Sequence, residues 1–349
     1  MLRKLLPVCV LAALFAGHDA FAEDALRVQW RRAADLPQAV GGPAAGVLGG
    51  KLVVAGGTFW ENAEKKFWIP KASAYDVKAD SWTPLSDLPK DTAYSCAVST
   101  QDAVYVFGGA CKDETWPDTW KLVAEGDGFA WKPFVPLPNP LCNMEAALIG
   151  GTAYVVAGTK DGNDLATSVD NNVWRIDLAA PEPAWKACVA LPGPLRCGVG
   201  VAACGEKLYA FGGAVTSPLY GGSGNSDEAY VYDPAASRWT RIADTPYPAS
   251  WWWAVTFADR YVILAGGHLW SSLVTAKNRP TSDTYGFMRE VLVYDTKTGV
   301  YSLLEPLPMG IIDYGFARIG NEILLVGGED APRHRANWLM IGTLTEPGK

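Results

Sequence analysis

One pattern recurs six times along the chain and limits what the chain can fold into. Each copy begins with an aromatic residue that is followed seven residues later by a proline. A pair of small residues, Gly-Gly in every copy except Ala157-Gly158, then closes an apolar segment 20 or 21 residues beyond that proline. The aromatic and proline positions are Trp30/Pro37, Trp82/Pro89, Trp131/Pro138, Trp185/Pro192, Trp239/Pro246 and Tyr301/Pro308. A repeat of about 50 residues predicts one array of repeated units rather than two separate domains.

The segments that end in the small pairs are typical of β-strands. Lys51–Ala55, Ala103–Phe107 and Lys207–Phe211 are rich in β-branched and aromatic residues and stop at glycine. A weaker strand precedes each of them, a third follows, as in Ala229–Asp233, and the repeated aromatic residue marks a fourth. Four antiparallel strands per unit, arranged around an axis, predict an all-β protein of the β-propeller class.

The two ends of the chain complement each other. The first aromatic segment, Leu26 to Pro37, has no glycine pair before it, and the last pair, Gly327-Gly328, has no aromatic segment after it. We therefore predict that the N-terminal strand completes the last blade, which pairs two strand edges that would otherwise be exposed. The sequence predicts a single six-bladed β-propeller domain over residues 23–349.

The first 22 residues are typical of a cleaved signal peptide. Arg3 and Lys4 precede an apolar run from Leu5 to Phe15, and Ala20-Phe21-Ala22 offers a cleavage site between small residues. The apolar run is shorter than the roughly 20 residues that a membrane-spanning helix needs. We expect an exported protein, located in the periplasm or, as the alternative, secreted, with no membrane partner.

The charge and the cysteines exclude several partners. The whole chain carries a net charge of −7, which is unfavourable for binding nucleic acid. The cysteines beyond the signal peptide lack metal-ligand spacing, and we interpret them as buried free thiols rather than disulfides. They are Cys96, Cys111, Cys142, Cys188, Cys197 and Cys204. We therefore expect no nucleic acid, no metal and no other cofactor.

The spacing of the repeat also locates the variable face. The segment from proline to glycine pair is nearly constant, whereas the segment after each pair varies in length, so the insertions follow the second strand of each unit. Loops after the glycine pairs and loops after the prolines should share one mouth of the central channel, where function usually resides. The role of the longest insertion, 268–289, stays open, and a lid over the mouth is one candidate.

Charged and aromatic residues gather in these loops. We expect most tryptophans to pack between blades, and at most two of Trp251–Trp253 to face the channel. Aromatic rings beside carboxylates and arginines suit a sugar, because rings stack on C–H faces while charged groups bind hydroxyls and acids. The candidate residues are Glu329, Arg335, Arg196, Asp313, Tyr314, His268, Arg333 and Trp252.

Two features resemble known proteins. The Gly-Gly strands with a downstream tryptophan resemble kelch propellers over essentially all of the chain beyond residue 22. The stretch from Leu191 through Gly213, with Tyr230–Pro234 and Trp239, looks like an early blade of the bacterial N-acetylneuraminate epimerases. Ala39–Gly57, which follows the blade of Gly327-Gly328 once the ring is closed, is similar to the blade that comes next in that family, so the chain resembles a cyclically permuted member.

That resemblance extends to a charged loop. Glu329, directly after Gly327-Gly328, with Arg335 six residues later, is similar to the Gly-Glu…Arg loop of the epimerases. The resemblance implies that Glu329 and Arg335 are the catalytic pair. Arg333 is the alternative candidate for the role of Arg335.

A sugar mutarotase opens and recloses a hemiketal ring, which requires a proton acceptor and a proton donor. We expect Glu329 to accept the proton and Arg335, aided by Arg196, to bind the sugar carboxylate. Tyr314 or His268 is the candidate acid.

Two alternatives stay open. A kelch propeller can bind a glycan or a protein partner without catalysis, because the scaffold implies no chemistry. A copper enzyme like galactose oxidase, which shares kelch blades, needs two histidines, two tyrosines and a crosslinked cysteine. Only His268 and His334 lie beyond the signal peptide, and neither is next to a tyrosine.

Overall fold

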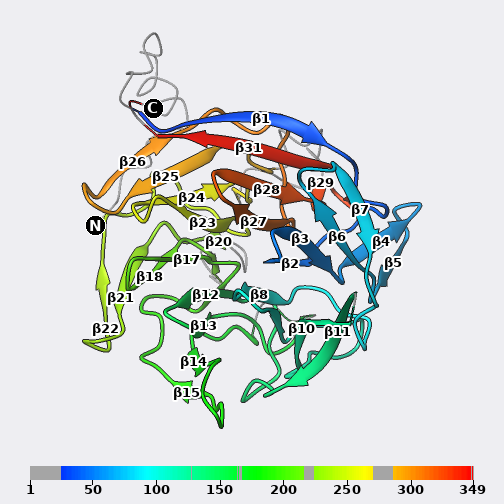
Figure 1. Ribbon diagram of the computed structural model, residues 1–349. Coiled ribbons are helices and arrows are strands. Elements are labelled where there is room, and N and C mark those ends of the chain that lie inside the picture. The colour runs from blue at the N-terminus through cyan, green and yellow to red at the C-terminus, as the bar shows by residue number, and fades with distance from the viewer. Residues whose placement is uncertain are drawn as a thin grey trace.

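β-Strands form all the regular secondary structure in the described part of the chain (Figure 1). The predicted signal peptide, 1–22, and most of the long insertion, 270–285, lie outside the described residues. The computed structural model describes residues 25–126, 128–162, 164, 167–215, 224–269, 286–346 and 348. Within these ranges no helix exists that could cross a membrane. The all-β prediction is confirmed.

Six four-stranded antiparallel sheets, one for each repeat, form the body of the described structure. Each sheet is a blade that extends from an innermost strand at the centre to an outermost strand at the rim. In that order, the strands of the blades are β2 (Ala44–Leu48), β3 (Lys51–Ala55), β6 (Ala72–Asp76) and β7 (Ser81–Pro84); β8 (Cys96–Ser99), β9 (Ala103–Phe107), β10 (Thr119–Glu125) and β11 (Gly128–Phe134); β12 (Glu145–Ile149), β13 (Thr152–Val156), β14 (Val173–Asp177) and β15 (Lys186–Ala187); β17 (Gly200–Cys204), β18 (Lys207–Phe211), β21 (Ala229–Asp233) and β22 (Arg238–Arg241); β23 (Trp253–Phe257), β24 (Tyr261–Ala265), β25 (Val291–Asp295) and β26 (Val300–Leu303); and β27 (Gly315–Ile319), β28 (Glu322–Val326), β31 (Leu339–Thr345) and β1 (Arg27–Ala33).

Shorter strands extend the loops that follow some glycine pairs. They are β4 (Thr58–Glu61) with β5 (Lys65–Trp68), β29 (Glu329–Ala331) with β30 (His334–Arg335), and β16 (Arg196–Cys197) with β19 (Ala214–Val215) and β20 (Gly224–Asn225). The hairpins of the first and last blades become important at the site described below.

The N-terminal strand completes the last blade, as predicted. β1 pairs with β31 along its whole length, from Arg27 opposite Thr345 to Ala33 opposite Leu339. Figure 1 shows the two strands running side by side at the rim. One sheet therefore contains both the first and the last strand of the described chain.

The innermost strands lie side by side around the centre of Figure 1. Contacts connect β2 to β8, β8 to β12, β12 to β17, β17 to β23, β23 to β27, and β27 back to β2. The second strand of each blade is covered on both faces by neighbouring blades, and β9 and β24 are buried at all five positions. This double burial explains why these strands are continuous apolar runs rather than alternating ones. The arrangement is that of a β-propeller.

The repeated aromatic residue joins each blade to the one before it. Its indole N–H or hydroxyl donates a hydrogen bond of 2.7 to 3.2 Å to a backbone oxygen four residues after the aromatic residue of the preceding repeat. The pairs are Trp82–Ala34, Trp131–Ser86, Trp185–Val135, Trp239–Val189, Tyr301–Ala243 and Trp30–Glu305. The last pair returns from the first repeat to the sixth. Each such hydrogen bond contributes about 1 kcal/mol to the stability of the folded protein. This explains why an aromatic donor recurs in every repeat.

Candidate functional site

Six equivalent residues surround the mouth of the central channel, one shortly before each innermost strand. All six have a left-handed backbone, with φ between 49° and 66°. We call them the mouth ring: Gly42, Tyr94, Asn143, Gly198, Trp251 and Asp313. Backbone hydrogen bonds of 2.6 to 3.1 Å connect Tyr94 N to Gly42 O, Asn143 N to Tyr94 O, Gly198 N to Asn143 O, Trp251 N to Gly198 O, and Gly42 N to Asp313 O. The mouth ring therefore fixes where its side chains stand.

Bulky side chains in the mouth ring imply a purpose beyond the fold. A left-handed backbone is uncommon for residues such as Tyr94 and Trp251 and costs on the order of 1–3 kcal/mol each. Each of these rings packs against a glycine that stands one place earlier in the mouth ring. A Cβ at Gly42 would lie 2.6 Å from the Tyr94 ring, and one at Gly198 would lie 3.1 Å from the Trp251 ring. Strain of this kind is concentrated at functional sites.

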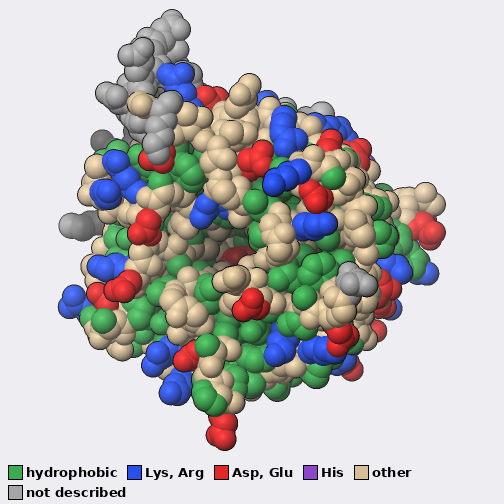
Figure 2. Space-filling model, in the orientation of Figure 1, with side chains coloured by type: hydrophobic (Ala, Val, Ile, Leu, Met, Phe, Trp, Pro, Cys, Tyr) green, Lys and Arg blue, Asp and Glu red, His purple; other side chains and the backbone are tan. Residues whose placement is uncertain are grey.

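A cavity of about 320 Å³ opens at the mouth ring. The centre of the propeller is hollowed on the face shown in Figure 2, and side chains of both charges are interspersed around it. The cavity is lined by the four ring side chains Tyr94, Asn143, Trp251 and Asp313 and by Lys66, His268, Phe287 and Glu329, among others. Residues after the prolines and residues after the glycine pairs thus meet in one cavity, as the spacing of the repeat predicts.

The β29–β30 hairpin carries the charged pair that the sequence singles out. Glu329 and Arg335 are opposite each other in this hairpin, and Arg335 Nη1 donates a hydrogen bond to Glu329 Oε2. The backbone N–H of Arg333 donates to the other carboxylate oxygen, Glu329 Oε1, at 2.7 Å. Both carboxylate oxygens of Glu329 therefore accept hydrogen bonds from the same hairpin, and Glu329 lines the cavity.

Arg335 is packed into the wall behind Glu329, with 7% of its surface exposed. Its Nε donates to Thr58 Oγ1 at 3.2 Å. A Cβ at Gly41 would lie 2.6 Å from Arg335 Cδ and Nε, so the Arg335 side chain can pack against this position only because it is glycine. Burial lowers the pKa of Arg335, but the combined effect of Tyr94, Glu329 and Asp313 is larger. The pKa of Arg335 is therefore raised above its ordinary value. The geometry makes Arg335 a residue that positions Glu329.

Lys66 is a cavity residue that the sequence analysis missed. Its Nζ donates to Tyr94 Oη at 2.6 Å and lies 4.9 Å from the ring centroid of Trp68. The β4–β5 hairpin, which follows the first glycine pair, carries it to the mouth. The alternation of lysine and aromatic residues between 65 and 68, in a loop that the repeat spacing assigns to the mouth, is the signal that could have found it.

Asp313 brings a second carboxyl group into the cavity. It is 9% exposed and belongs to both the mouth ring and the cavity wall. Burial raises the pKa of Asp313 to about 6, and the charge of Glu329 adds to this, while Arg335 and Lys66 oppose it. Asp313 therefore changes its protonation state near neutral pH, which suits an acid–base group.

Two predicted binding residues do not reach this cavity. Arg196 is fully buried, and its guanidinium donates to Ser226 Oγ at 2.9 Å, Pro192 O at 2.9 Å and Glu228 Oε2 at 3.3 Å. These hydrogen bonds hold the Arg196 side chain within its own blade. Trp252 is 1% exposed and packs in the core between blades. Because side chains alternate, its neighbours face the channel instead: Trp251 lines the mouth cavity and Trp253 the channel below.

The remaining candidates divide between the cavity and its surroundings. His268 lines the cavity, with its ring against Phe287. Tyr314 lies deeper, where its hydroxyl donates to Ala265 O and accepts from Trp253 N. The Arg333 guanidinium is outside, 5.3 Å from a tryptophan ring centroid. Arg335, not Arg333, therefore contacts Glu329 through its side chain.

The described residues contain no group of three or more His, Cys, Asp or Glu side chains that could hold a metal ion. The six cysteines in the same ranges are free thiols, and four of them are buried.

A family model described as the kelch motif matches residues 195–246. The chain is 25% identical over 260 residues to "Kelch-like protein terF" of Aspergillus terreus, a match that covers 70% of this chain and 54% of that protein. It is 28% identical over 256 residues to "N-acetylneuraminate epimerase" of Brucella melitensis biotype 1, covering 64% and 58%. It is 25% identical over 333 residues to "Kelch-like protein 35" of Mus musculus, covering 91% and 46%.

These matches support kelch repeats in this chain. With the observed all-β propeller they agree on the fold, while the relatives' names divide between an epimerase and kelch-like proteins. The matched region spans between 46% and 58% of the length of these three relatives.

Proposed function

We propose that the mouth cavity binds an acidic sugar and interconverts its anomers. One observation carries the proposal: two carboxyl groups, Glu329 and Asp313, share a cavity of about 320 Å³ with Lys66. The similarity to a protein named N-acetylneuraminate epimerase adds support and suggests N-acetylneuraminate as the first substrate to test.

The proposed reaction uses the two carboxyl groups as base and acid. Glu329 accepts the proton of the anomeric hydroxyl as the bond between the anomeric carbon and the ring oxygen breaks, and protonated Asp313 delivers a proton to that ring oxygen. The product is the open-chain ketone. After the carbonyl turns its other face, Asp313 takes the proton back from the attacking hydroxyl and Glu329 returns its own to the carbonyl oxygen. No net proton is gained or lost.

The cations have separate roles in this scheme. Lys66 lines the cavity, so we assign it the sugar carboxylate. Arg335 donates hydrogen bonds to Glu329, to Thr58 Oγ1 and, at 3.4 Å, to Tyr94 Oη, which makes it a positioning residue rather than the substrate clamp that the sequence suggests. Trp251 and Tyr94 offer the rings on which a sugar face can stack.

The test follows the exchange between the two anomers of N-acetylneuraminate by NMR. Glu329→Gln keeps the size of the side chain and removes the base, and we expect a loss of roughly 100-fold or more in the enzyme-dependent rate. Glu322→Gln is the matched control, because Glu322 belongs to the same blade but forms an outer ion pair with Arg31. Equal rates for wild type and Glu329→Gln would remove Glu329 from the mechanism.

A non-catalytic binding module is the second candidate, favoured by the match to a kelch-like protein over 91% of this chain. The same samples separate the two functions. Saturation transfer from the protein to the sugar without accelerated anomer exchange would identify a binding protein.

We also propose export to the periplasm, on the sequence of residues 1–22. Mass spectrometry of the protein from fractionated cells should find a mature chain that begins at Glu23. An intact Met1 in the cytoplasmic fraction would contradict export.

A further inference from the structure

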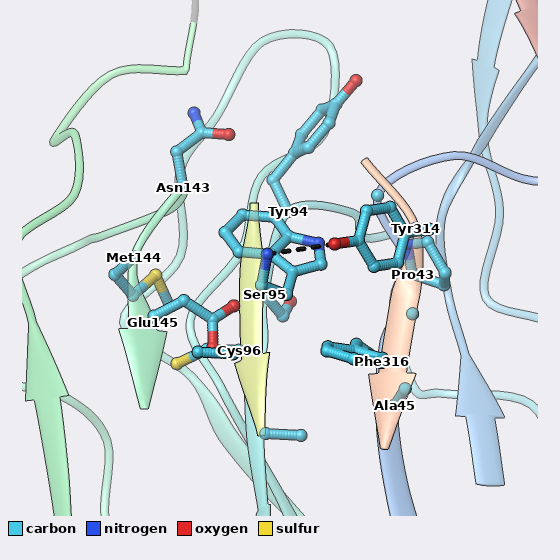
Figure 3. A pocket seen from close by; sticks show the side chains of 15 residues that line it. Pro43, Ala45, Tyr94, Ser95, Cys96, Asn143, Met144, Glu145, Tyr314 and Phe316 are labelled. Carbon is cyan, nitrogen blue, oxygen red and sulfur yellow. Dashed lines mark hydrogen bonds between the residues drawn. The ribbon is translucent and has the colours of Figure 1, made fainter. Parts of the chain in front are cut away.

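A second cavity lies in the central channel directly beneath the mouth. It has a volume of about 50 Å³ and shares Tyr94 and Asn143 with the mouth cavity. Figure 3 shows both side chains among the residues that line it. Glu145, the first residue of β12, lines it two positions after Asn143. Trp253 and Phe316 form apolar parts of its wall. The two cavities are therefore consecutive parts of one path from the mouth into the channel.

Most polar groups of the channel cavity are already engaged. Tyr314 donates its hydroxyl hydrogen to Ala265 O, and Ser95 Oγ donates to Gly108 O at 2.9 Å. Asn143 Nδ2 donates to Thr159 Oγ1 at 3.2 Å. Among the described residues, the carboxyl group of Glu145 forms no hydrogen bond to another side chain, so it is able to meet a ligand.

This cavity offers a ligand an uncharged hydrogen-bond donor beside aromatic rings. Burial raises the pKa of Glu145 to about 8, against the effect of the Ala146 backbone N–H. Burial likewise raises the pKa values of two more lining groups, Cys96 and Tyr314. At neutral pH the cavity therefore presents a protonated carboxyl group, which donates one hydrogen bond. A charged ligand group would be unfavourable there, whereas a carbonyl with an attached methyl group fits.

We propose that the channel cavity is a specificity subsite that receives a small acyl amide substituent of the sugar, with Glu145 donating a hydrogen bond to the amide carbonyl. A water needs about 10–15 Å³ of such space, so the cavity holds a group of three or four heavy atoms, the size of an acetamide. The methyl group then contacts Trp253 and Phe316. This assignment rests on the proposed function, because it takes the sugar in the mouth cavity as given.

The experiment compares the binding of two sugars by calorimetry. One is N-acetylneuraminate, and the other is the analogue with a hydroxyl in place of the acetamido group. We expect the wild type to prefer the acetamido sugar by roughly 10-fold or more, the usual effect of one hydrogen bond in a desolvated site. Glu145→Gln keeps an N–H donor of the same length and should keep the preference. Glu145→Met keeps the length without the donor and should lose most of the preference, with unchanged affinity for the hydroxyl analogue.

Each outcome decides between the two proposals. A wild type without preference, or a Glu145→Met variant that keeps it, overturns the subsite. A Glu145→Met variant that loses affinity for both sugars equally, with a native circular dichroism spectrum, also overturns it. A preference for the acetamido sugar without accelerated anomer exchange leaves the subsite standing and overturns the mutarotase. Failure of both sugars to bind overturns both proposals.

Discussion

Replacing Asp313 with asparagine should stabilise the folded protein and at the same time reduce its activity. Asp313 is 9% exposed, and burial raises its pKa from an ordinary value of 3.8 to about 6. Because the pKa is higher in the folded protein than in the unfolded chain, the contribution of this carboxyl to stability is complete only below pH 3.8. That contribution is lost as the pH rises through 6.

The size of the effect follows from the shift in pKa. About two pKa units correspond to roughly 3 kcal/mol of cost once Asp313 is fully ionised, at pH 8, and to about 1 kcal/mol at pH 4.5, where the folded form is still protonated. Asparagine never ionises. The free energy of unfolding of Asp313→Asn, relative to wild type, should therefore increase by about 2 kcal/mol between pH 4.5 and pH 8.

Urea unfolding followed by tryptophan fluorescence at the two pH values measures this difference. Any fixed difference in packing between aspartate and asparagine cancels, because only the change with pH is used. Asp102→Asn, at an exposed position between β8 and β9, is the control and should show no such change. A relative stability of Asp313→Asn that is the same at both pH values would refute the raised pKa and with it the acid role of Asp313.

Three further predictions test other parts of the structure. The rate of anomer exchange by the wild type, measured by NMR, should decrease above about pH 6 as Asp313 ionises, and Asp313→Asn should show a low rate without this dependence; a wild-type rate that rises there would contradict the acid role. Gly41→Ala should slow exchange by displacing Arg335 from Glu329, whereas Gly128→Ala, with no atom within 4 Å of the added Cβ, should not; equal rates would contradict the positioning role. Tyr301→Phe removes the hydrogen bond to Ala243 O and should lower the free energy of unfolding, measured in urea titrations, by about 1 kcal/mol. An unchanged value would show that this inter-blade bond does not stabilise the fold.

The two proposals depend on the same physical effect at two depths of the channel. Asp313 and Glu329 stand where the ring of the sugar would lie, while Glu145 stands one step deeper. The same physical effect, burial of a carboxyl group, raises the pKa of Asp313 to about 6 and that of Glu145 to about 8. The upper group can then exchange a proton near neutral pH, and the lower one stays a hydrogen-bond donor.

The sequence by itself determined the architecture. The aromatic residues recur because each donates a hydrogen bond to the preceding blade, as Trp82 does to Ala34 O, and a property that every unit needs leaves a periodic trace. The glycine pairs recur for a similar reason, because both residues have positive φ, 65° at Gly327 and 103° at Gly328. The missing strand of the last unit likewise predicted the pairing of β1 with β31.

Only the tertiary structure decided which residues meet at the site. Lys66 and Glu329 lie 263 positions apart in the chain yet line one cavity, since the ring brings the first and last blades together. Arg196 looked like a second clamp, but nearby acceptors such as Ser226 Oγ retain it within its own blade. Trp251 rather than Trp252 lines the mouth cavity, because neighbouring side chains point to opposite sides and Trp252 packs in the core between blades. Periodicity records what all six units share, whereas the site is built from what differs between them, and those differences converge only once the ring of blades has formed.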